Sequence, residues 1–167
     1  MKVVGLDLGG TKIAAGVFDG KRLLSKVVVP TPKEGGERVA EALAEAAERA
    51  EREAGVRGEA IGLGTPGPLD FRRGVIRFAP NIPGVQDFPI RRILEEATGR
   101  PVFLENDANA AALAEHHLGA AQGEESSLYL TVSTGIGGGV VLGAPVGHWE
   151  ALQIGRAARR ARVYTMV

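Results

Sequence analysis

The chain has 167 residues, which is enough for one ordinary domain or for one domain with an appendage. Twenty basic residues balance twenty acidic ones, so no net field attracts nucleic acid or an anionic membrane. Cysteine is absent and no apolar stretch reaches about 18 residues, so we expect no disulfide, no thiolate zinc site, no membrane-spanning helix, no signal peptide and a cytoplasmic location.

Residues 2–29 predict three antiparallel strands in a meander. The ranges 2–8, 13–18 and 22–29 are largely apolar, and Asp19-Gly20 is typical of a hairpin turn between the last two. Pro30 and Pro32 end the third strand, because proline cannot donate to a strand ladder.

The clearest helix is expected at residues 37–54. Val39, Leu43, Ala46 and Ala50 recur at helical spacing, and Gly55 provides a stop. The elements expected after it are a strand at 60–64, a rigid turn at 65–68, a small ribbon at 75–78, a loop at 79–84, a helix at 90–98, a strand at 101–105, a helix from 106 to about 118, and a hairpin of 128–132 with 140–142.

The turn Asp7-Leu8-Gly9-Gly10-Thr11-Lys12 is a candidate phosphate cradle. It joins two predicted strands, whereas a P-loop or a dinucleotide fingerprint opens a helix. Successive N–H groups in such a hairpin can form an anion-binding nest, and glycine permits close backbone approach and positive φ. Thr11 adds a hydroxyl, Lys12 a charge, and Asp7 could hold Mg²⁺ through water. An ordinary tight turn that needs glycine is the alternative.

A second glycine-rich segment, Ser133-Thr134-Gly135-Ile136-Gly137-Gly138-Gly139, is predicted to be a turn of the same kind. Each glycine adds conformational entropy to the unfolded chain, so a structural hairpin rarely needs so many. Close approach of the backbone to a ligand explains the run, and a flexible bend is the alternative. Two such cradles facing one carboxylate would form a phosphotransferase site.

Asp107 directly follows a predicted buried strand and stands in the first turn of a helix that Asn106 is expected to cap. A carboxylate near a helix N-terminus is commonly structural, because the helix dipole stabilises it. The functional interpretation is a general base that takes the proton of a hydroxyl attacking a γ-phosphate. Asn106 or Asn109 could then hydrogen-bond the same polyol.

A histidine pair at the end of a predicted helix and an arginine cluster near the C-terminus both suggest solvated surfaces rather than sites. His116 and His117 are adjacent and point to different faces of the helix, which excludes an i,i+4 metal pair. We expect both to be solvated at the helix end. A solvated helix face is also expected for a basic cluster: Arg156, Arg159, Arg160 and Arg162.

Taken together, these motifs resemble the ROK family of sugar kinases and regulators, within the actin-like ATPase (ASKHA) superfamily. The matching segments occur in family order across residues 2–142: Leu6 to Lys12, Gly62 to Pro68, Ala79 to Gly84, Leu104 to Glu115 and Thr131 to Val140. The resemblance implies an α/β fold, with a ribonuclease H-like, actin-like ATPase (ASKHA) lobe at residues 1–122 whose mixed sheet is flanked by helices. Residues 123–167 would be a fragment of an incomplete second lobe, with the phosphate hairpin and a divergent C-terminal helix.

The resemblance also implies ATP-dependent phosphorylation of a hexose at its 6-hydroxyl. Glucose is the default substrate, and N-acetylmannosamine, fructose and allose are alternatives. Asp107 would be the catalytic base, and the sugar would be bound by Gly64, Thr65, Pro66, Gly67, Asn81, Asn106 and Asp107. The phosphates of ATP, with Mg²⁺ near Asp7, would be held by Asp7, Gly9, Gly10, Thr11, Lys12, Thr134, Gly135, Gly137 and Gly138.

The C-terminal part departs from the family pattern. Family members continue after the glycine-rich hairpin with a Gly-Glu-x-Gly-His segment, a cysteine-rich zinc site and a large second lobe with the adenosine contacts. Gly147-His148 could be a remnant of the Gly-His pair. Alternatively, residues 149–159 resemble the helix after the zinc cysteines, with the intervening segment deleted, and we favour this interpretation.

Because positioning supplies much of the rate of phosphoryl transfer, one lobe with a fragment of the other is expected to turn over weakly or not at all. The alternative is a non-catalytic sugar-binding or oligomerising protein. Open strand edges at residues 128–142 tend to pair with another chain, so we expect a homo-oligomer. We expect neither nucleic acid nor membrane as a partner.

Overall fold

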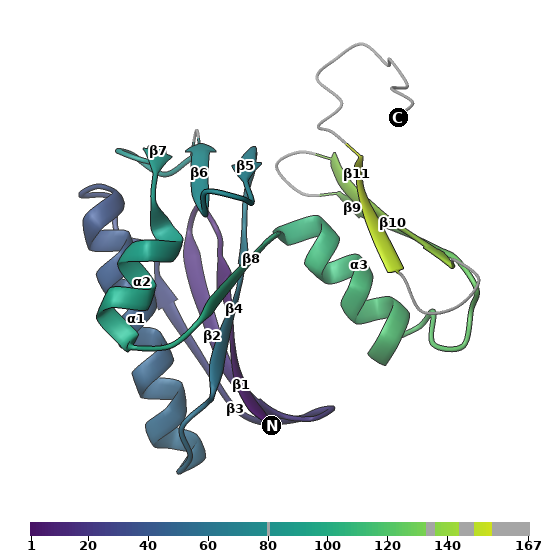
Figure 1. Ribbon diagram of the computed structural model, residues 1–167, viewed down its shortest axis with the longest axis horizontal. Coiled ribbons are helices and arrows are strands. Elements are labelled where there is room, and N and C mark those ends of the chain that lie inside the picture. Colours follow the sequence, from purple (N-terminus) through teal and green to yellow (C-terminus); the bar gives the residue numbers. More distant parts are fainter. Residues whose placement is uncertain (80, 133–135, 144–148, 155–167) are drawn as a thin grey trace. The chain divides into compact units, whose positions relative to one another are not determined.

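The computed structural model of the chain describes residues 1–79, 81–132, 136–143 and 149–154. They fall into two compact units, Met1–Asp107 and Ala108–Val167 (Figure 1). This boundary lies earlier in the chain than the expected lobe boundary at residue 122, and the functional division into two lobes stays a prediction. Within the described ranges, no helix is both long and apolar enough to cross a membrane.

The first unit is built on a five-stranded mixed sheet with the order β3-β2-β1-β4-β8. The strands β1 (Lys2–Leu8), β2 (Lys12–Asp19) and β3 (Arg22–Pro30) form the predicted antiparallel meander. The strands β4 (Ala60–Thr65) and β8 (Val102–Asn106) extend the sheet in parallel with β1. The mixed sheet predicted from the family resemblance is therefore confirmed.

Two helices, α1 (Gly36–Ala54) and α2 (Ile90–Thr98), lie on one side of this sheet (Figure 1). Both were predicted, and each ends at a glycine in the left-handed region, Gly55 with φ 67° and Gly99 with φ 68°. The core between helices and sheet is aliphatic; its fully buried large side chains include Val4, Leu8, Ile13, Val17, Val39, Leu43, Ile61, Leu63, Ile90 and Leu94.

A small antiparallel sheet follows β4 in the chain. It has the order β5-β6-β7, formed by β5 (Leu69–Asp70), β6 (Val75–Phe78) and β7 (Gln86–Phe88). The ribbon predicted at residues 75–78 is present, but its two partners are too short to give a readable periodicity. The loop at residues 79–84 connects β6 to β7, and Pro80 lies outside the described residues.

The second unit contains an antiparallel sheet with the order β11-β10-β9. Its strands are β9 (Ser127–Val132), β10 (Ile136–Gly143) and β11 (Trp149–Ile154), and the helix α3 (Asp107–Leu118) begins at the boundary between the units. The predicted strand pair around residues 128–142 is confirmed.

The prediction that the glycine run forms a turn is wrong for Gly137, Gly138 and Gly139. These residues lie within β10 and pair with Thr131, Leu130 and Tyr129 of β9. A Cβ at Gly139 would lie 2.7 Å from the Ala112 Cβ of α3, so the glycine there allows the helix to pack closely on the strand.

The expected C-terminal helix at residues 149–159 is wrong for residues 149–154, which form β11. This strand pairs with β10 from Gly138↔Ile154 to Gly143↔Trp149. Its backbone N–H and C=O groups are therefore bonded to the edge of β10, whereas in a helix they would bond to one another. Residues 155–159, Gly147-His148 and the basic cluster at 156–162 lie outside the described residues.

The expectation that His116 is solvated is also wrong. Its side chain is only 4% exposed, and its Nδ1 lies 2.9 Å from the Ser127 hydroxyl of β9. His116 falls on the same face of α3 as the buried Asn109 and Ala112, which faces the β9–β11 sheet. His117, on a different face, is exposed as predicted.

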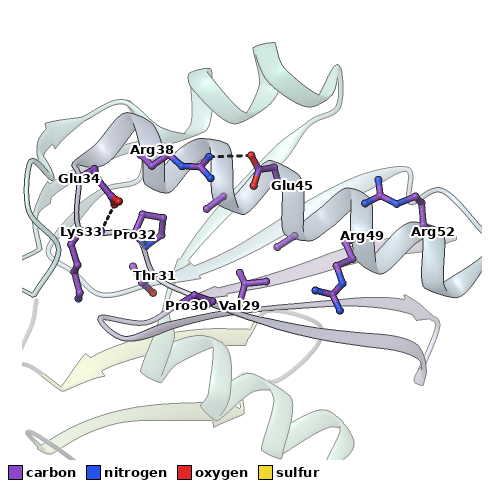
Figure 2. Close-up of a pocket in the computed structure, with 12 residues that line it drawn as sticks. Val29, Pro30, Thr31, Pro32, Lys33, Glu34, Arg38, Glu45, Arg49 and Arg52 are labelled. Atoms are coloured by element: carbon purple, nitrogen blue, oxygen red, sulfur yellow. Dashed lines mark hydrogen bonds and ion pairs between the residues drawn. The ribbon is translucent and has the colours of Figure 1, made fainter.

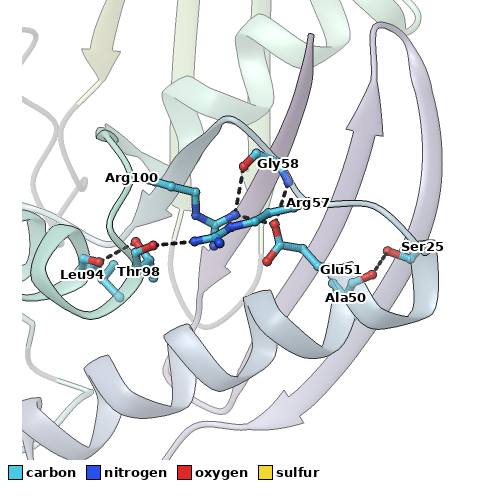
Figure 3. A network of polar contacts seen from close by, with 8 residues as sticks. All are labelled: Ser25, Ala50, Glu51, Arg57, Gly58, Leu94, Thr98 and Arg100. Atoms are coloured by element: carbon cyan, nitrogen blue, oxygen red, sulfur yellow. Dashed lines mark hydrogen bonds and ion pairs between the residues drawn. The ribbon is translucent and has the colours of Figure 1, made fainter.

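A buried ion pair links α1 to the end of the five-stranded sheet at which β4 and β8 begin. Arg100, just before β8, pairs with Glu51 of α1, and their side chains are only 7% and 11% exposed. Arg100 also donates to the Gly58 carbonyl at 3.1 Å, and the Gly58 N–H donates to Glu51 at 2.6 Å (Figure 3). The segments that lead into β4 and β8 are therefore held by the same carboxylate.

Breaking this pair should destabilise the chain. Arg100→Met leaves the Glu51 charge buried without its partner, which typically costs about 3–5 kcal/mol in free energy of unfolding. The control is Arg92→Met, because the Arg92–Glu96 pair on α2 is exposed and its loss should cost within about 0.5 kcal/mol. Urea unfolding followed by circular dichroism measures both, and equal losses would contradict the structural role of Arg100.

Candidate functional site

The parallel pairing of β1, β4 and β8 brings the carboxyl ends of these strands to one edge of the sheet. Asp7 pairs with Gly64, and Thr65 pairs with Asn106. Thr65 and Asn106 are buried, whereas Asp107, the next residue, is exposed. Ligands of such sheets bind beyond the carboxyl ends of the strands, so this edge is the candidate site.

Asp107 lies close enough to Asp7 for its charge to act on the Asp7 carboxyl. Crowding by neighbouring protein atoms raises the pKa of the Asp7 carboxyl although part of its surface is open to solvent. The negative charge of Asp107 raises this pKa further, and Lys12 lowers it in part. The site therefore holds two carboxylates whose mutual repulsion a bound cation would relieve.

The turn between β1 and β2 lies beside the loop that contains Asn81. The Gly9 N–H donates to the Lys12 carbonyl at 3.0 Å and closes the turn. A Cβ at Gly10 would lie 2.9 Å from the Asn81 Cβ, and one at Gly9 would lie 2.9 Å from the Lys12 carbonyl oxygen. Neither glycine has positive φ. Close approach therefore explains both glycines, and left-handed backbone does not.

The turn that follows β4 lies at the same edge. Pro66 and Gly67 are half-buried, and the Thr65 hydroxyl donates to the Pro66 carbonyl at 3.3 Å. Thus the predicted sugar-binding residues Gly64 to Gly67 and Asn106 gather at the strand ends, next to Asp107. Their proposed contacts to a sugar stay predictions.

The predicted second cradle belongs to the other unit of the chain. Gly137 and Gly138 belong to the second unit, and Thr134 and Gly135 lie outside the described residues, as does Ser133. Across the described part of the chain, no group of three or more His, Asp or Glu side chains could hold a metal ion.

Sequence reasoning missed two residues that contact the first turn, Thr31 and Lys33. The Thr31 hydroxyl donates to the Gly9 carbonyl at 2.7 Å, and the Lys33 Nζ donates to the Gly10 carbonyl at 2.5 Å. Pro30 and Pro32 marked the segment as the end of a strand. No local pattern indicated that it folds back onto the turn.

Comparison with known proteins identifies related sequences along most of the chain. The ROK family model matches residues 3–149. The glucokinase of Thermotoga maritima is 39% identical, in a match that covers 89% of this chain and 50% of the glucokinase.

Solved structures agree with this relationship. A ROK hexokinase from Thermus thermophilus shares 99% identity with a TM-score of 0.81, over 86% of this chain and 47% of the hexokinase. A ROK family glucokinase from Streptomyces griseus, solved in complex with glucose and AMPPNP, shares 40% identity with a TM-score of 0.79, over 89% of this chain and 47% of its own. The chain thus spans about half the length of the relatives it matches.

Asp7→Asn should stabilise the chain at neutral pH. Because the folded-state pKa of Asp7 lies above its ordinary value of 3.8, ionisation of this carboxyl opposes folding as the pH rises through that window. The uncharged Asn removes this penalty, so the advantage of the variant should be largest at pH 7 and fade as the pH falls toward 3.8.

Urea unfolding at several pH values measures this difference, with Asp19→Asn at the exposed end of β2 as the control. An Asp7→Asn variant whose advantage does not grow with pH would contradict a raised pKa. Asp107→Asn should in turn lower the Asp7 pKa, which carbon-detected NMR titration of the Asp7 carboxyl reports directly.

Proposed function

The chain belongs to the ROK family, and we propose that the strand-end edge of its first unit is the sugar and phosphate half of a hexose kinase site. The observation that supports this most is the register that places Asp7, Thr65, Asn106 and Asp107 at one edge. A relative of 40% identity was solved with glucose and AMPPNP, which favours glucose as the default sugar and ATP as the phosphate donor.

In this proposal Asp107 is the catalytic base. Its carboxylate is exposed at the end of β8, where it can accept the proton of the attacking 6-hydroxyl as that oxygen bonds to the γ-phosphorus. Asn106, Asn81 and the turn from Gly64 to Gly67 hold the other sugar hydroxyls. The leaving ADP takes the electron pair of the broken P–O bond.

The turn from Gly9 to Lys12 holds phosphate oxygens through backbone N–H groups, the Thr11 hydroxyl and the Lys12 charge. This turn suits an anion because Thr11 and Lys12, which carry hydrogen-bond donors, are both exposed. Mg²⁺, when bound with the nucleotide, neutralises charge on the phosphates. Asp7 would hold the hydrated ion, because its carboxylate lies beside Asp107 and gains from a nearby cation. Gly137, Gly138, Thr134 and Gly135 are proposed as further phosphate contacts.

The chain should transfer phosphate weakly or not at all by itself. It spans about half of its relatives' length. Holding the reactants in position can lower the barrier by on the order of 7–11 kcal/mol, and a chain that does not hold both reactants loses that contribution. A coupled assay of ADP release with glucose and MgATP tests this, with Asp107→Asn as the control for any residual rate. Robust turnover by the 167-residue chain would overturn the expectation of weak activity.

As a second candidate function, the chain would bind a sugar or assemble with other copies without catalysis, in the cytoplasm. It is favoured by β9, an edge strand on which Leu128, Leu130 and Val132 are 58%, 60% and 78% exposed. Alternate residues of a strand share one face, so these side chains form an apolar stripe that another copy could cover. Calorimetric binding of glucose without phosphorylation would support this candidate.

Leu130→Lys should reduce the assembly of the chain, because it places a charge in the middle of the apolar stripe. The matched control is Leu23→Lys, since Leu23 is 46% exposed on the edge strand β3 of the first unit. Light scattering over a range of concentrations measures the mass of both variants and of the parent chain. A parent chain that stays monomeric at all concentrations would contradict the homo-oligomer.

A further inference from the structure

We propose that Thr31 and Lys33 are positioning residues that turn the carbonyl groups of the Gly9–Lys12 turn away from a bound phosphate. The inference rests on the proposed function, because it concerns the phosphate site of that same turn. Thr31 directly follows β3, and Lys33 lies two residues further along the chain. Both contact the turn, although β2 and β3 separate them from it in the sequence.

Three successive carbonyls of the turn are bonded to this one segment. The Thr31 hydroxyl donates to Gly9 O at 2.7 Å, and the Thr31 N–H donates to Thr11 O at 3.0 Å. The Lys33 Nζ donates to Gly10 O at 2.5 Å. Carbonyl oxygens repel phosphate oxygens, so bonding all three to one segment removes the acceptors that would oppose an anion.

The amide groups of the same turn show the opposite pattern. Gly9 N–H closes the turn on the Lys12 carbonyl at 3.0 Å. For the N–H groups of Gly10 and Thr11, the described part of the chain provides no hydrogen-bond acceptor. Among the residues that the structure describes, the turn therefore has two backbone donors without an acceptor while three of its carbonyls are occupied, which is the arrangement an anion-binding nest requires.

The two positioning residues are held differently. Thr31 is only 4% exposed, so its hydroxyl has little access to water and its bond to Gly9 is the one that satisfies it. Lys33 is exposed and lies with Thr31 along an open groove of about 770 Å³ between β3 and α1 (Figure 2). Its ammonium group adds positive charge beside the turn and has two further N–H donors.

NMR of the full chain tests this role with Thr31→Val, which keeps the shape of the side chain and removes its hydroxyl. The first readout is hydrogen exchange of the Gly9 amide, and the second is titration with inorganic tripolyphosphate followed at the Gly10 and Thr11 amides. Thr31→Val should speed Gly9 exchange and weaken tripolyphosphate binding, each about fivefold for one lost hydrogen bond. Thr31→Ser, which keeps the hydroxyl, should restore both.

Two further variants separate position from charge. Lys33→Met should weaken tripolyphosphate binding and leave Gly9 exchange nearly unchanged. The control is Thr98→Val in α2, which removes an equivalent bond of 2.7 Å from a threonine hydroxyl to the Leu94 carbonyl, and it should change neither readout (Figure 3). Both threonine bonds are partly buried, so a general loss of stability would appear in both variants.

The outcomes distinguish this inference from the proposed function. If the parent chain responds to tripolyphosphate at Gly10 and Thr11 but Thr31→Val behaves like Thr98→Val, the positioning role is overturned and the phosphate site stands. If these amides of the parent chain do not respond at all, both proposals are overturned at this turn. If Thr31→Val does not fold, Thr31→Ala removes the same hydroxyl, and equal tripolyphosphate binding by Thr31→Ala and Thr31→Ser overturns the role of Thr31. Equal binding by Lys33→Met and the parent chain overturns the role of Lys33.

Discussion

The parallel register of β1, β4 and β8 is the constraint on which the candidate site depends. It aligns Asp7 with Gly64 and Thr65 with Asn106, so that residues far apart in the chain end at the same edge. A slip of one residue would move every side chain of a strand to the other face of the sheet. The buried Arg100–Glu51 pair acts at the opposite end, where it holds the segments that lead into β4 and β8.

The register also determines which charged groups lie near one another at this edge. Asp7 and Asp107 lie near each other, and desolvation together with the second charge raises the pKa of Asp7. Two close carboxylates are unfavourable in the absence of a cation, whereas a hydrated divalent ion and a phosphate give them partners. The neighbouring turn complements them, because it offers backbone donors and directs its carbonyls toward Thr31 and Lys33.

Much of the first unit could be predicted from the sequence, because its signals are local. The meander has a hairpin turn at Asp19-Gly20, and α1 has an apolar stripe with a glycine stop at Gly55. What could not be predicted depends on contacts between distant segments. Residues 149–154 were predicted as a helix from their resemblance to a segment of the family, but they pair with β10. His116 is buried only because α3 packs on the second sheet. Likewise, only the folded chain shows that the segment after β3 returns to the phosphate turn.

The central claim is that sugar and phosphate meet at the carboxyl ends of β1, β4 and β8. Backbone amide chemical shifts of the full chain, recorded with glucose and with MgAMPPNP added separately, test it most directly. We predict that glucose shifts the amides of Thr65 and Asn106, whereas the nucleotide shifts those of Gly10 and Thr11. Shifts confined to residues away from this edge, or the absence of shifts with both ligands at millimolar concentration, would contradict it.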